Sequence, residues 1–79
     1  MRKRSMSIAG HRTSIALEPE FWEVLEEMAA RQGISLSQLV AEIDKARGIG
    51  NLASAIRVRV LKAMRAAAAA LPRVDALRD

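Results

Sequence analysis

The clearest pattern of apolar and polar positions is a strict alternation over residues 12–17, RTSIAL. Thr13, Ile15 and Leu17 fall on one side of an extended backbone, and the residues between them fall on the other. This period of two predicts a strand with one buried face. Pro19 follows almost at once and opens a helical pattern, so we expect the strand to be short.

The next segment predicts a helix over residues 19–32. Pro19 suits the first helical position, where its missing N–H would have no partner anyway. Gly33 follows the last apolar position and predicts a left-handed cap that ends the helix. The apolar stripe consists of Phe21, Leu25, Met28 and Ala29.

A second helix is predicted from its start signal. Residues 35–38 read S-L-S-Q, a capping box, and Ile34 with Leu39 can form the hydrophobic staple across it. The pattern breaks near Arg47, where glycines follow at positions 48 and 50. The apolar face of this helix consists of Leu36, Leu39, Val40 and Ile43.

Asn51 is a good N-cap for a third helix, which we expect over residues 51–71, before Pro72 stops it. We expect residues 72–79 to be a frayed tail. On a helical wheel, basic side chains occupy the face opposite the apolar one. The apolar face holds Leu52, Ile56, Val60, Met64, Ala67 and Leu71, and the basic face holds Arg57, Arg59, Lys62 and Arg65.

The strand over 12–17 has no evident partner in its own chain. We interpret residues 1–11 as a flexible basic arm, because Gly10 interrupts any extension of the strand. A single strand would leave a row of backbone groups unpaired, so we expect it to pair with its copy in a second chain. Two such strands form an antiparallel ribbon, an element that can enter the DNA major groove.

Composition and charge favour a nucleic-acid partner over catalysis. The 79 residues carry a net charge of +4 and include one histidine and no cysteine. Thiolate metal sites and disulfides are therefore excluded, and one imidazole cannot build a metal site. No nucleophile, base and orienting acid converge, so we expect neither enzymatic activity nor a cofactor. No run of about 18 apolar residues is present, so we expect no membrane span, and a cytoplasmic location.

The charge is unevenly distributed along the chain. Residues 1–17 contain Arg2, Lys3, Arg4 and Arg12 but no acid. The first predicted helix is acidic, and bases dominate again from Arg57 onward. This pattern suits a protein whose acidic helix faces away from DNA while basic segments face it.

The order of strand, acidic helix, glycine and capped second helix resembles the ribbon-helix-helix DNA-binding family of MetJ/Arc/CopG type. The resemblance covers about residues 12–43 and rests on R-x-S-I-A-L at 12–17 and G-I-S-L-S at 33–37. It implies a mostly helical domain over 12–47, with an intermolecular two-stranded ribbon in a homodimer. The segments T-S-I-A-L-E-P-E-F-W and N-L-A-S-A-I-R-V also look like a small bacterial subgroup with an added helix.

The resemblance assigns base reading to alternate outward residues of the strand: Arg12, Ser14 and Ala16. An arginine fork can bind guanine O6 and N7 together, whereas Ala16 departs from the usual polar residue and can only make apolar contact. The family also anchors phosphates on the start of its second helix, here Ser35, Leu36 and Ser37. From their charge, Arg2, Lys3 and Arg4 are added as phosphate contacts.

We therefore expect an obligate homodimeric, sequence-specific DNA-binding protein, a transcriptional repressor associated with the nucleoid. Pairs of dimers are expected on adjacent half-sites. An alternative is an antitoxin-like module whose helix at 51–71 binds and neutralises a partner protein. A third interpretation assigns that helix to higher oligomers of an architectural protein.

Overall fold

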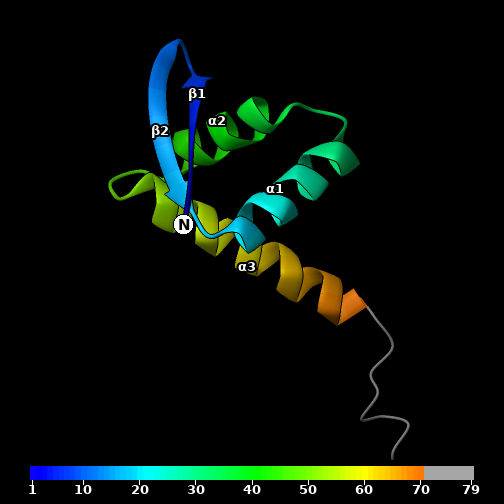
Figure 1. Cartoon of the computed structure of the whole chain (residues 1–79). Helices are drawn as coiled ribbons and strands as arrows, with labels where there is room; N and C mark the ends of the chain where they lie inside the picture. Colours follow the sequence, from blue (N-terminus) through cyan, green and yellow to red (C-terminus); the bar gives the residue numbers. More distant parts are fainter. Residues whose placement is uncertain (71–79) are drawn as a thin grey trace, which may run out of the picture.

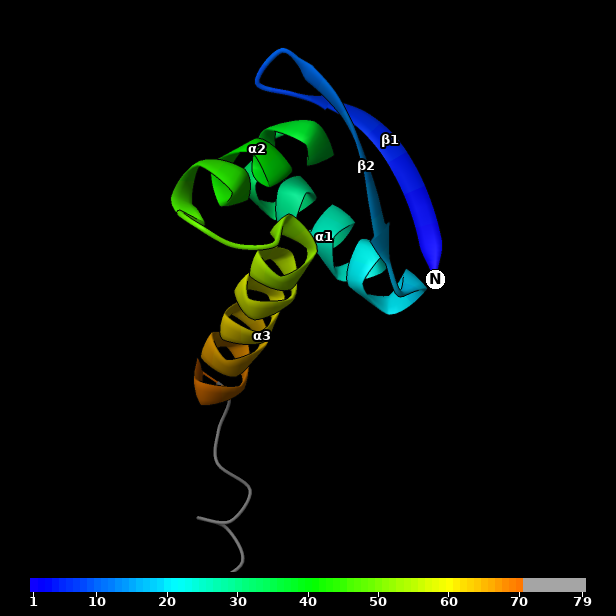
Figure 2. The ribbon, with the colours of Figure 1, turned by 90° about the vertical axis from the view of Figure 1, so that its left-hand side faces the viewer.

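The computed structural model describes residues 1–70, which form a hairpin and three helices (Figure 1). The order is β1 (Arg2–Ile8), β2 (His11–Leu17), α1 (Pro19–Gln32), α2 (Leu36–Ala46) and α3 (Leu52–Ala70). Figure 2 shows the hairpin running along one side of the helices, while α3 extends away from it. The fold class is thus confirmed as mostly helical, with a two-stranded antiparallel ribbon, two helices and a third helix.

The expected origin of the second strand is wrong. Residues 2–8 are not a flexible arm but form β1, which pairs antiparallel with β2 of the same chain in the register Ser5 opposite Ser14. The connection is the two-residue turn Ala9–Gly10, where φ is 51° and 83°. Positive φ at both positions matches the turn type whose twist fits a hairpin. Gly10 therefore makes the turn instead of ending the strand.

The inner face of the hairpin closes the core. Ile15 and Leu17 are buried, as the alternation predicts, and Met6 and Ile8 of β1 are buried beside them. The helices cover this face, and all six of the largest fully buried side chains lie in β2 and the helices. These six are Leu17, Trp22, Leu25, Leu39, Val40 and Ile56. One chain therefore buries a continuous core without a second copy.

The helix boundaries follow the predicted capping residues. Pro19 lies in the first turn of α1, and Gly33 caps its end with φ 69° while its N–H bonds Ala29 and Ala30 carbonyls. The capping box of α2 is complete, since Gln38 N–H donates to Ser35 Oγ at 3.1 Å and Ser35 N–H donates to Gln38 Oε1 at 2.9 Å.

The third helix belongs to the same core only along its first half. Asn51 caps it by accepting from Ser54 N–H at 3.1 Å, and Ile56 and Val60 are buried. The predicted apolar side does not continue, because Met64 is 53% exposed. Beyond Val60, α3 projects past the other helices (Figure 1). The predicted stop at Pro72, the apolar position Leu71 and the tail 72–79 lie outside the described residues.

Candidate nucleic-acid interface

The side of the hairpin that faces away from the helices gathers one set of side chains, which we term the outer face. It alternates with the buried positions on both strands, as the period of a strand requires. All its members are exposed except Ala16, which is half-buried. The outer face consists of Lys3, Ser5 and Ser7 of β1, and Arg12, Ser14 and Ala16 of β2.

The two strands place these residues in three facing pairs. Lys3 lies opposite Ala16, and Ser7 lies opposite Arg12. At the centre, the hydroxyl oxygens of Ser5 and Ser14 are 3.1 Å apart and form a hydrogen bond. A cation therefore stands near each end of the outer face, with hydroxyl groups between them and no carboxylate on the face itself.

Contacts on the inner side hold β1 in place. Trp22 Nε1 donates to the Arg2 carbonyl oxygen at 2.8 Å. The Arg4 guanidinium stacks over the Trp22 ring at 4.8 Å and donates to Glu26 at 3.2 Å. These contacts join the hairpin to α1, so the outer face rests on a supported ribbon.

The three residues predicted as phosphate contacts in segment 2–4 therefore do not lie on one surface. Lys3 lies on the outer face, whereas Arg4 lies on the inner side and its guanidinium is engaged by Glu26 and Trp22. Arg2 is exposed at the open end of the hairpin, opposite Leu17. Only Lys3 of these three shares a surface with Arg12 and Ser14.

The predicted phosphate site at the start of α2 lies elsewhere on the chain. Ser35 Oγ is used as the helix cap, and Leu36 and Ser37 are half-buried. In Figure 1 the connection from α1 to α2 lies on the opposite side of the molecule from the hairpin. One chain does not, therefore, bring this helix start onto the outer face.

Ser5 and Ser7 were missed by the sequence interpretation. A signal was available, because Met6 and Ile8 alternate with Ser5 and Ser7 as Ile15 and Leu17 alternate with the outward residues of β2. The basic residues ahead of Ser5 weakened this signal. Arg4 lies opposite Ile15 and against the Trp22 ring, so it occupies the inward position that the alternation along β1 requires.

An ion pair joins the end of the ribbon to the third helix. Arg57 Nη2 and Nε lie 2.9 and 3.1 Å from the same carboxylate oxygen of Glu18. A backbone hydrogen bond and, after it, the Arg57 guanidinium hold the pKa of Glu18 below its ordinary value. Arg57 also lies 5.7 Å from the centre of the Phe21 ring. Arg57 is therefore used within the fold and differs from the other cations predicted on α3.

No cluster of three or more potential metal-ligating side chains occurs within residues 1–70. No helix in that same range is long and apolar enough to cross a membrane.

A family model described as a ribbon-helix-helix domain matches residues 1–64. The match covers the hairpin, α1, α2 and most of α3, so the chain belongs to the ribbon-helix-helix family, a class of DNA-binding regulatory domains. Comparisons with curated proteins and with solved structures gave no match.

Proposed function

We propose that this protein is a sequence-specific DNA-binding regulator that places the outer face of its hairpin in the major groove. The observation that carries the proposal is the composition of that face: two cations and three hydroxyl side chains without an acid, on a ribbon backed by a closed core. Family membership supports a DNA-binding regulatory role in general.

The dimensions of a hairpin suit this placement. Neighbouring strands lie about 4.8 Å apart, and the major groove is about 12 Å wide, so a two-stranded ribbon enters it. Arg12 is the proposed reader of guanine, because its fork matches O6 and N7. Ser14 and Ser5 add hydrogen bonds to base edges of either type, and Ala16 offers a methyl contact to thymine.

The proposed assembly on DNA is a homodimer. A second copy would account for the position of the α2 start, since the connection from α1 to α2 lies away from the hairpin of its own chain (Figure 1). In the proposed dimer this helix start binds the phosphates that flank the partner's ribbon. Two dimers then occupy adjacent half-sites.

The regulatory outcome that we propose is repression. A ribbon and flanking helix ends bound across an operator would exclude other proteins from the same groove and backbone. The proposed site of action is bacterial nucleoid DNA in the cytoplasm.

The salt dependence of binding to a mixed-sequence duplex tests the location of the interface. The Lys3→Ala/Arg12→Ala variant removes both cations of the outer face. Lys45→Ala/Arg65→Ala is the matched control, because it removes two exposed cations from α2 and α3. Each lost phosphate contact should lower the slope of log K against log salt by about 0.9. We expect a lower slope or weaker binding for the first variant alone. Equal effects of both variants would contradict the proposal.

A second function is favoured by the far half of α3. Leu61 and Met64 are exposed there, and the helix contains no acidic residue. Such a face can bind a partner protein in the manner of an antitoxin. The test is growth of cells that express the neighbouring reading frame together with this protein or with its Leu61→Asp/Met64→Asp variant. Relief of growth inhibition by the wild type alone supports this function, and the absence of any inhibition rejects it.

A further inference from the structure

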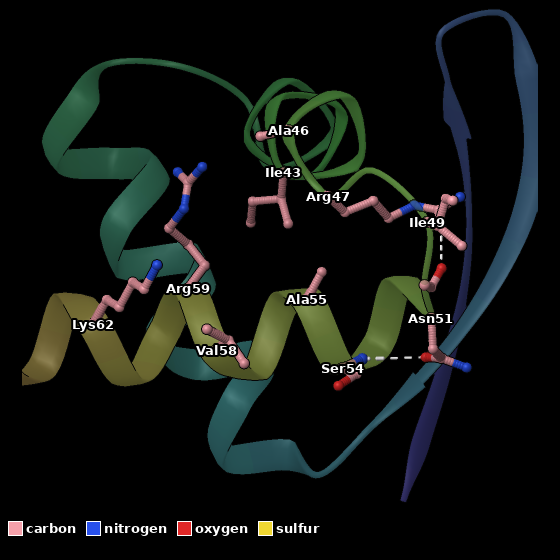
Figure 3. A pocket seen from close by; sticks show the side chains of 11 residues that line it. Ile43, Ala46, Arg47, Ile49, Asn51, Ser54, Ala55, Val58, Arg59 and Lys62 are labelled. Carbon is pink, nitrogen blue, oxygen red and sulfur yellow. Dashed lines mark hydrogen bonds between the residues drawn. The ribbon is translucent and has the colours of Figure 1, made fainter.

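A cavity of about 380 Å³ lies between the end of α2, the connecting segment 47–51 and the first half of α3 (Figure 3). Its size falls within the range of small-molecule sites in proteins. It lies apart from the outer face and uses none of that face's residues. We propose that this cavity binds a small amphipathic organic anion, a molecule with a carboxylate or phosphate head group and a short apolar part.

One part of the cavity wall is apolar. Ile43 of α2 and Ala55 of α3 point toward one another across it, and Val58 continues the wall along α3 (Figure 3). Ile43 belongs to the buried core, so this wall is backed by packed side chains. An apolar group of a ligand placed here would be removed from water, which favours binding.

The other part of the wall is cationic. Arg59 and Lys62, one turn apart on α3, both extend toward the space between the helices (Figure 3). Neither has a carboxylate within ion-pair distance among residues 1–70, whereas Arg57 on the same helix is paired with Glu18. No acidic residue lines the cavity. Two cations with free donors beside an apolar wall suit an anionic head group.

The connecting segment forms the third side of the cavity and is held in shape by Arg47. Its guanidinium donates to Asp44 at 2.6 Å and to the Gly50 carbonyl oxygen. Ile49 lies on this segment and is fully exposed, although an apolar wall lies nearby. The Ile49 side chain could pack on the apolar part of a bound ligand. Burial of the Ile49 side chain would then strengthen binding.

The ligand class follows from these two kinds of wall. An inorganic anion would use Arg59 and Lys62 but leave the apolar wall in water. A neutral apolar molecule would use Ile43, Ala55 and Val58 but leave the cations without a partner. A molecule with both parts satisfies both surfaces, and the carboxylate and phosphate alternatives share the same recognition by cationic donors.

The experiment is an NMR titration of the full chain in which backbone amide shifts report each binding site. The probes are octanoate, octyl phosphate, inorganic phosphate and octyl glucoside, each below the concentration at which micelles form. We expect saturable shifts in segment 46–59 with octanoate or octyl phosphate, and the stronger of the two identifies the head group. Arg59→Ala/Lys62→Ala should weaken this binding at least about tenfold, since it removes two charge-assisted contacts.

The matched control is again Lys45→Ala/Arg65→Ala, because neither residue lines the cavity. It should bind octanoate or octyl phosphate as the wild type does. Equal loss in both double variants would overturn the proposal in favour of general charge attraction. Equal binding of octyl glucoside would overturn it in favour of a purely apolar groove. No saturable shift with either anionic probe would also overturn it. Unchanged melting temperatures would show that the variants are folded.

Discussion

Arg57 and Glu18 join the third helix to the point where the ribbon ends and α1 begins. Both guanidinium contacts, at 2.9 and 3.1 Å, go to one carboxylate oxygen. Glu18 also caps α1, since its carbonyl oxygen accepts from the N–H groups of Phe21 and Trp22. The added helix is therefore attached to the same residue that sets the turn from ribbon to helix, and α3 is integrated with the domain.

This relationship predicts a pH dependence of stability. The pKa of Glu18 is lower in the folded chain, through a backbone hydrogen bond first and Arg57 second. The folded state therefore favours the carboxylate. Its stabilising contribution is full above the ordinary pKa of 4.5 and is lost as the pH falls through the lowered value. The difference in urea midpoint between wild type and Glu18→Gln should shrink from about pH 7 to about pH 3.

The control for this prediction is Glu20→Gln, an exposed position in the first turn of α1 without an ion pair among residues 1–70. Its difference from wild type should vary less with pH. A Glu18→Gln difference that stays constant over the whole range would show that the ion pair does not contribute.

The hairpin turn provides a direct test of pairing within one chain. Ala9 has φ 51°, a conformation that glycine adopts without the steric cost of a Cβ atom. Ala9→Gly should therefore stabilise the protein by about 0.5–1 kcal/mol, measured by urea unfolding. Gly10→Ala, at φ 83°, should destabilise it by about 1 kcal/mol. If Ala9→Gly destabilises the protein instead, β1 is not held by this turn.

Trp22 should stabilise the hairpin through one hydrogen bond as well as by burial. Trp22→Phe leaves the Arg2 carbonyl oxygen without its donor and removes part of a side chain that is 1% exposed. We expect a loss of about 1–3 kcal/mol in unfolding free energy and faster hydrogen exchange in β1. Phe21→Leu serves as the control, because Phe21 is half-buried and makes no contact to β1 of this kind. Equal exchange in both variants would contradict this role of Trp22.

The sequence predicted the elements whose signals are local. Pro19 and Gly33 correctly predicted the two ends of α1, and the capping box correctly predicted the start of α2. Each of these signals acts within one helical turn. The alternation in β2 also correctly predicted that Ile15 and Leu17 lie on its buried face. These parts needed no knowledge of the rest of the chain.

The parts that could not be predicted depend on contacts distant in sequence. Arg4 occupies an inward position because the Trp22 ring and Glu26 receive its guanidinium, and no local pattern shows this. Local charge alone therefore predicts an arm where the chain forms β1. The helical period predicts Met64 on the apolar face, but Val60 is the last buried residue of α3 and Met64 is exposed. Periodicity cannot show where neighbouring helices stop covering a face.

The proposed readers predict different effects of two single substitutions. Arg12→Ala should relax the preference for one base position and cost about 1–3 kcal/mol at the preferred site. Lys3→Ala should weaken binding to all sequences alike. It should also lower the slope of log K against log salt by about 0.9, the value for one phosphate contact. Affinities for matched and mismatched duplexes separate the two. A uniform loss of affinity with Arg12→Ala would assign this residue to a phosphate contact.

In the proposed function, the outer face of the hairpin reads the DNA sequence. The most direct measurement is selection of bound duplexes from a random pool at about 150 mM salt, where unspecific attraction is suppressed. The wild type and the Lys3→Ala/Arg12→Ala variant are carried through in parallel. We predict that the wild type enriches one site with approximate dyad symmetry and that the variant loses it. Enrichment of the same site by both proteins, or no enrichment by the folded wild type, would contradict the claim.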